Sequence, residues 1–163
     1  MTSQKEERTT ETMTNSMDTP VYSAPQTTLT VRDIAIHIGN QADDYSRDFE
    51  VQLIPGEIDV LQVVVGDNEE FPVYVSATET QVLCITYLCS EDEVRPDAKT
   101  KMLEAMLEMN IPIPLSAFSR IDDRYVLFGA VSSHARSASV VNEIITLADN
   151  AIDGLSALED FLI

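Results

Sequence analysis

The stretch "TQVLCITYLC", residues 80–89, constrains the fold more than any other part of the chain. Successive side chains of a strand point to opposite faces of a sheet, so each alternating set of residues describes one face. Both sets are apolar here, with Val82, Cys84 and Leu88 in one and Leu83, Ile85 and Tyr87 in the other. A strand exposed on one face would alternate apolar with polar residues. The stretch therefore predicts a central strand that is covered on both faces.

Three segments before this stretch supply its neighbours in the sheet. They read "FEVQLI" (49–54), "DVLQVVV" (59–65) and "FPVYVSA" (71–77), and they are dense in Val, Ile, Tyr and Phe. Short runs that contain Gly, Pro, Asp or Thr separate them, as turns do. The region predicts a meander of three or four antiparallel strands.

A second strand region covers residues 115–131, "LSAFSRIDDRYVLFGAV". Both of its halves alternate with a period of two, and the pair Asp122 and Asp123 can turn between them. The region therefore predicts a hairpin. Phe118 belongs to the alternating set opposite Leu115, and Phe128 belongs to the set opposite Leu127. We therefore expect the two rings on one face of the sheet.

Three other segments carry apolar residues at the spacing of an amphipathic helix. The first spans residues 30–39, where Thr30 and Asp33 form a capping pattern. The second spans 97–109, and the third runs from 137 to 163. The resulting order is α-β-β-β-α-β-β-α, an α+β fold with an antiparallel sheet covered by helices.

Residues 1–27 differ from the rest because they are rich in Thr and Ser and poor in apolar side chains. Such a segment cannot bury enough surface to offset the entropy of ordering, so we predict a disordered tail. Residues 28–163 are about the size of one domain, and we predict a single α+β domain there.

The charge of the chain limits its partners. There are 28 acidic and 10 basic residues, which give a formal net charge of -18 at pH 7. Such a field repels nucleic acid and anionic lipid, and it favours basic protein partners. No apolar run approaches the length of a membrane span, and the N-terminus lacks the apolar stretch of a secretory signal. We therefore expect a cytoplasmic protein that does not insert into a membrane.

The residues that often carry chemistry do not form a recognised site. Cys84 and Cys89 are five residues apart in a predicted strand, which is not the spacing of a metal pair, so we expect buried reduced thiols. His134 follows Ser133 directly, but adjacency in sequence is not a catalytic triad, and no G-x-S-x-G motif occurs. His37 has no second ligand at a suitable spacing. The sequence predicts no catalytic residue, cofactor or metal centre.

Two alternatives stay open. The acidic runs "ADDYSRDFE" and "GDNEE" do not match the calcium-loop pattern, but they leave room for a weak cation site. The missing motifs also leave room for a small enzyme or metabolite-binding domain with an unrecognised site.

Three phrases resemble the bacterial YjfI family, a domain of unknown function: "EEFPVYVSATETQVLCITYLCSEDEV", "LEAMLEMNIPIPLSAFSRIDDRYVLFGAVS" and "VVNEIITLADNAID". The resemblance runs from about residue 30 to the end of the chain, and "IPLSAF" and "YVLFGAVS" are its most distinctive parts. Members of that family tend to be encoded beside phage-shock, PspA-like proteins. The resemblance implies an accessory role in membrane stress, and it supplies no catalytic residues.

The order of elements, the small size and the acidity also resemble the type III secretion chaperone fold. This second resemblance implies a homodimer that holds an extended segment of a partner protein. We therefore expect a non-enzymatic, protein-binding protein of the chaperone-like or adaptor kind. The helical stripes and the sheet hold more apolar groups than a small α+β core obviously needs, and symmetric dimerisation is the commonest way to cover such an excess.

Two surfaces follow from this expectation. The Met-bearing helix 97–109 and the hairpin 115–131 form the expected dimer seam, because the chaperones that the chain resembles dimerise through the corresponding region. The expected seam comprises Met102, Met106, Met109, Phe118 and Phe128. The first helix is then left free to meet the partner. Its expected binding residues are the apolar Val31, Ile34 and Ile38 and the acidic Asp33, Asp43 and Asp44.

Overall fold

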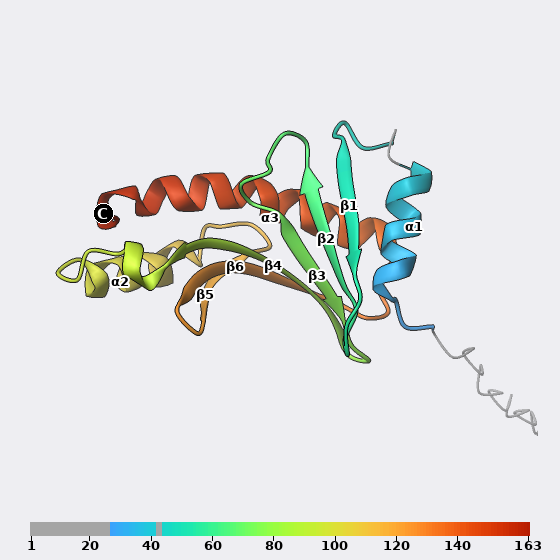
Figure 1. Cartoon of the computed structure of the whole chain (residues 1–163), viewed down its shortest axis with the longest axis horizontal. Coiled ribbons are helices and arrows are strands. Elements are labelled where there is room, and N and C mark those ends of the chain that lie inside the picture. The colour runs from blue at the N-terminus through green and yellow to red at the C-terminus, as the bar shows by residue number, and fades with distance from the viewer. Residues whose placement is uncertain (1–26, 42–43) are drawn as a thin grey trace, which may run out of the picture.

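The computed structural model of the chain describes residues 27–41 and 44–163. Within these ranges the chain forms one six-stranded antiparallel sheet and three α-helices (Figure 1). The elements are, in chain order, α1 (Val31–Gln41), β1 (Phe49–Ile54), β2 (Val60–Val65), β3 (Val73–Ala77), β4 (Gln81–Ser90), the 3-10 turn η2 (Glu91–Glu93), α2 (Lys99–Met109), β5 (Ala117–Ile121), β6 (Arg124–Ser132), α3 (Ser137–Leu158) and the 3-10 turn η3 (Glu159–Phe161). The predicted α+β class is confirmed, with four strands before α2 in place of three. The predicted tail lies, except for Thr27, outside the described residues.

Residues 81–89 of the apolar stretch lie in β4, in the middle of the sheet. The strand order is β1-β2-β3-β4-β6-β5, so β4 has β3 on one side and β6 on the other. The predicted hairpin is present as β5 and β6, and its turn is Asp122 and Asp123 between the paired residues Ile121 and Arg124. Asp122 has a φ of 52°, a left-handed conformation that Asp tolerates in tight turns.

The register of this hairpin contradicts one expectation. Phe118 pairs with Leu127, whereas Phe128 pairs with Ala117. Residues that pair across two strands lie on the same face, so the two phenylalanine rings lie on opposite faces. The two-residue turn is the cause, because it pairs odd-numbered with even-numbered residues. The prediction that both rings share one face is wrong.

The core lies between the sheet and α3. This helix runs along the sheet, with α1 beside its N-terminal part and α2 near its C-terminal end (Figure 1). Its buried stripe is Val140, Ile144, Leu147, Ala151 and Leu158. These side chains pack in one hydrophobic cluster with buried residues of the central strands, including Cys84, Tyr125 and Leu127. The amphipathic spacing read from the sequence is therefore the packing surface of the longest helix.

The opposite face of the sheet has no helix on it among the described residues. The side chains of Leu83 and Ile85 on this face are half-buried, and Tyr87 is 37% exposed. The expectation that β4 is covered on both faces is therefore wrong within the described part of the chain. The reason is that α1 and α3 pack on the same side of the sheet, while α2 packs at its end beside β5 and η3.

None of the helices in the described ranges combines the length and the apolar character that crossing a membrane requires.

Candidate protein-binding surfaces

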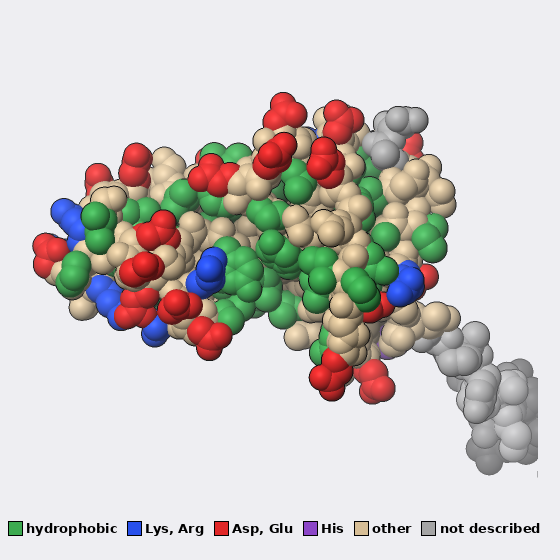
Figure 2. All heavy atoms as spheres, viewed as in Figure 1, with side chains coloured by type: hydrophobic (Ala, Val, Ile, Leu, Met, Phe, Trp, Pro, Cys, Tyr) green, Lys and Arg blue, Asp and Glu red, His purple; other side chains and the backbone are tan. Residues whose placement is uncertain are grey.

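The uncovered side of β3, β4, β6 and β5 forms a continuous apolar surface, which we call the open face. Its apolar side chains are Tyr74, Leu83, Ile85, Tyr87, Ile121 and Phe128, and Val126 points to the same side but is buried. Figure 2 shows this side of the molecule, with hydrophobic side chains gathered over β3, β4 and β6 and acidic side chains toward the edges. The outward positions of these four strands include no Asp or Glu. A surface without carboxylates is unusual in a chain with a net charge of -18.

Aromatic contacts organise one end of the open face. Tyr74 and Tyr87 meet edge to face, with ring centroids 5.8 Å apart. The guanidinium of Arg124 lies over the Tyr87 ring at 5.5 Å from its centroid. Such contacts hold the rings in place, so the surface is preorganised. Beside them is a shallow hollow of about 190 Å³, lined by Leu83, Ile85, Ser119, Ile121, Val126 and Phe128.

A second apolar surface lies at the α2 end of the molecule, and we call it the loop surface. It comprises Leu103 and Leu107 of α2 and Ile111 and Leu115 of the following loop. Leu107 is 69% exposed, Ile111 89% and Leu115 66%. All four lie within residues 103–115, and large apolar side chains exposed in one region are candidates for an interaction site.

Two asparagines hold the loop surface in shape. Asn110 Oδ1 accepts a hydrogen bond from the backbone N–H of Phe118 at 2.6 Å. Asn150 Nδ2 of α3 donates to the Pro114 carbonyl and to Ser116 Oγ, both at 2.8 Å. Leu115 has a φ of 57°, a strained conformation for a leucine that the surrounding hydrogen bonds maintain. The loop is therefore anchored at several points while its apolar side chains stay exposed.

A groove of about 300 Å³ lies beside this loop. Its lining is largely apolar and includes Met109, Pro112, Ile113 and Pro114 on one side and Gly154 and Ala157 of α3 on the other. Asp153 is the one acidic residue in its lining. Glu104 and Glu108 are exposed on α2, next to Leu103 and Leu107. The groove and loop therefore combine apolar contact area with nearby negative charge.

The residues expected to bind a partner through the first helix lie elsewhere. Val31, Ile34 and Ile38 are buried, because the apolar stripe of α1 packs into the core. They do not form an exposed docking surface. Asp33 is a cap: it accepts hydrogen bonds from the Thr30 N–H at 2.9 Å and the Thr30 hydroxyl at 2.7 Å, which lower its pKa. Asp44 is exposed, and Asp43 lies outside the described residues.

The residues expected to form a dimer seam are not brought together on one surface. Met102, Met106 and Phe118 are buried in the hydrophobic core, so they cannot meet a second chain. Met109 is half-buried in the lining of the groove, and Phe128 is half-buried on the open face. The sequence spacing located the elements correctly but assigned most of these side chains to the wrong environment.

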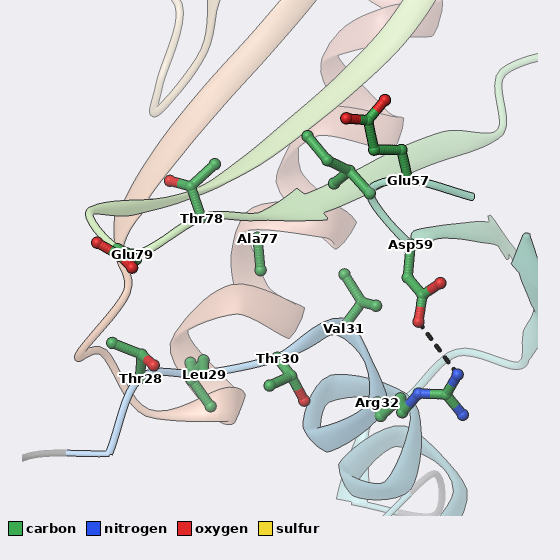
Figure 3. A pocket seen from close by; sticks show the side chains of 11 residues that line it. Thr28, Leu29, Thr30, Val31, Arg32, Glu57, Asp59, Ala77, Thr78 and Glu79 are labelled. Carbon is green, nitrogen blue, oxygen red and sulfur yellow. Dashed lines mark hydrogen bonds and ion pairs between the residues drawn. The ribbon is translucent and has the colours of Figure 1, made fainter. Parts of the chain in front are cut away.

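A pocket at the start of the first helix is open and lined in part by acidic side chains. It has a volume of about 570 Å³ and lies between the start of α1, the β1–β2 loop and the β3–β4 turn (Figure 3). Glu57, Asp59 and Glu79 contribute carboxylates to its lining, and Arg32 pairs with Asp59 at 3.1 Å. Its described lining includes no His, Cys or Lys.

One buried acid was missed by sequence reasoning. Glu143 of α3 lies under the sheet against Gly129, in a space that any larger residue at position 129 would fill. Its Oε1 has no hydrogen-bond partner among the described residues, and burial raises its pKa. The sequence contained a signal for this contact. Glu143 is an acid three residues after Val140 and next to Ile144 in α3, and Gly129 is a glycine inside the apolar strand β6.

The two cysteines are reduced and buried. Burial, and to a lesser extent the nearby charge of Glu143, raises the pKa of Cys84 to about 12. Burial likewise raises the pKa of Cys89 to about 11, with a smaller contribution from Glu93. Both thiols therefore stay protonated near neutral pH and are poor nucleophiles. In the described ranges, His, Cys, Asp and Glu side chains do not come together in groups of three that could hold a metal ion.

Fold and surfaces together define a small α+β protein whose distinctive features are exposed apolar surfaces. Comparison with protein families agrees with the bacterial character expected from the sequence. The family described as "Uncharacterized protein conserved in bacteria (DUF2170)" matches residues 28–162, and the chain belongs to it. A search of the curated proteins found no match.

Proposed function

We propose that the protein is a non-enzymatic, protein-binding protein of the adaptor or chaperone-like kind, acting in the cytoplasm. The observation that carries the proposal is the loop surface, where the side chains of Leu107, Ile111 and Leu115 are 69%, 89% and 66% exposed. Exposing such side chains has a cost in solubility, which a binding role explains. The hydrogen bond that Asn110 accepts from Phe118 and those that Asn150 donates preorganise the loop, so binding loses little conformational entropy.

The charge around the loop surface favours one kind of partner. Glu104, Glu108 and Asp153 lie beside its apolar side chains and groove. A segment with apolar anchors flanked by Lys or Arg would satisfy both the groove and the carboxylates. The net charge of -18 would also speed the approach of such a segment, and this effect should weaken as salt rises.

The resemblance to the YjfI family supports a specific first partner. That family tends to be encoded beside phage-shock proteins, so we propose a PspA-like protein as the partner and an accessory role in membrane stress as the process.

The experiment is a calorimetric titration of the full chain with a PspA-like protein of the same organism. Ile111→Glu puts a charge at the centre of the loop surface, and Ile36→Glu is the matched control, because Ile36 is 61% exposed on α1. We expect wild type and Ile36→Glu to bind alike, and Ile111→Glu to lose at least about tenfold in affinity, or roughly 1.4 kcal/mol. Absence of wild-type binding, or full affinity in Ile111→Glu, contradicts the proposal.

A further inference from the structure

We infer that the open face is an interface between two copies of this chain. Its central row consists of Tyr74, Ile85 and Phe128, which are direct neighbours across β3, β4 and β6. Leu83 and Tyr87 lie on either side of Ile85 along β4. Antiparallel sheets that meet solvent on one face carry polar residues there, whereas an apolar row across several strands is typical of a face packed against another layer.

The charge distribution points to a second copy as the occupant. The outward positions from β3 to β5 include no carboxylate, and Arg124 is the charged group at their edge. A basic partner would find no acid on this face to pair with. Two chains that each carry a net charge of -18 repel one another, and they can approach closely only through surfaces that lack acids. The open face is such a surface.

The shape of the open face suits a symmetric pair. A strand residue covers about 16 Å² of a sheet plane, so the four strands of the open face present roughly 460 Å² per copy before the relief of the side chains is counted. A standard interface buries about 800 Å² per partner, so the open face would form the central part of such an interface. In a two-fold dimer the same face of each copy meets the other, so one apolar sheet supplies the matching surface for its twin. The hollow beside Phe128 gives a projecting side chain of the second copy a place to pack.

This inference goes beyond the proposed partner binding, which uses the loop surface. It also corrects the expected seam: Phe128 is retained, whereas Met102, Met106 and Phe118 are replaced by residues of the open face. The two proposals can therefore fail separately.

The test uses substitutions that the single chain tolerates. Ala130 pairs with Leu83 and Ser119 pairs with Val126, so both lie on the open face, and both are exposed. Ala130→Glu and Ser119→Glu add a carboxylate there without removing core packing, and in a two-fold dimer they bring like charges together. Ser156→Glu, at an exposed position of α3, is the control of equal charge.

The full chain is measured by light scattering at about 100 μM, where an association of micromolar strength is complete. We expect wild type and the Ser156→Glu control to show twice the chain mass of 18.1 kDa, and both open-face variants to show 18.1 kDa. The Ile111→Glu variant should stay dimeric, which separates this result from the partner test. The unfolding midpoint of wild type should also rise with protein concentration, as linkage requires of a dimer.

A wild-type chain that is monomeric overturns the inference and leaves the open face to residues 1–26 or to another protein. Dimers that persist in both open-face variants overturn it as well, because they would have to form through a different surface.

Discussion

Replacing Gly129 by alanine tests the buried contact between β6 and α3. The added Cβ would lie 1.6 Å from Glu143 Oε1, 2.7 Å from its Cδ and 3.0 Å from the Leu115 carbonyl oxygen. Distances this short force the carboxyl group to move within a packed core. Overpacking of this kind costs about 1–3 kcal/mol. We expect a loss of about 2 kcal/mol, which lowers the unfolding midpoint by about 4–8 °C for a chain of this length.

The measurement is thermal and urea unfolding of the full chain followed by circular dichroism. Gly39→Ala is the matched control, because a Cβ at Gly39 of α1 meets nothing within 4 Å. It should stabilise the helix by about 0.5–1 kcal/mol. Combining Gly129→Ala with Glu143→Ala should recover most of the loss, because the clashing side chain is gone. The reasoning is refuted if Gly129→Ala unfolds like wild type. It is also refuted if Gly129→Ala costs as much free energy of unfolding in the Glu143→Ala background as it does in wild type.

Three further predictions concern single side chains. Burial raises the pKa of Glu143, so the folded state holds this proton at a higher pH than the unfolded state. The free energy of unfolding should therefore fall as the pH rises above the ordinary glutamate range. In unfolding measured across pH, Glu143→Gln should make this fall smaller. Phe118→Ala should cost about 3–5 kcal/mol in unfolding free energy because the ring is buried in the core, and Phe128→Ala should cost clearly less in the monomeric Ala130→Glu background. Cys84 and Cys89, with pKa values raised to about 12 and about 11, should react with a thiol reagent at neutral pH only on unfolding; rapid labelling of the native protein would contradict their burial.

Much of the fold could be predicted because its signals are local. The two-residue turn at Asp122, the alternation on either side of it and the helical spacing of α3 each follow from a few neighbouring residues. The position of β4 in the middle of the sheet followed from its two apolar faces. These inferences needed no knowledge of distant contacts.

The errors arose where a distant contact decides the outcome. An amphipathic stripe shows that a helix packs against something, but it does not say whether that surface belongs to the same chain, so Val31 and Ile34 were assigned to a partner. The faces of Phe118 and Phe128 depend on the pairing across the turn, which a single strand does not reveal. The loop surface was missed because Leu115 was assigned to the alternating strand of the hairpin, whereas β5 begins only at Ala117, and because Ile111 lies between that region and the predicted helix, where no period applies.

The central claim is that exposed apolar side chains after α2 bind a partner protein, and hydrogen–deuterium exchange tests it most directly. Exchange of the full chain is compared with and without the PspA-like protein. The account predicts slower exchange in residues 103–116, which include the loop surface, and unchanged exchange in α1, whose apolar stripe is already buried. Protection of α1 with no change in residues 103–116 would contradict the claim, and it would restore the first helix as the docking surface.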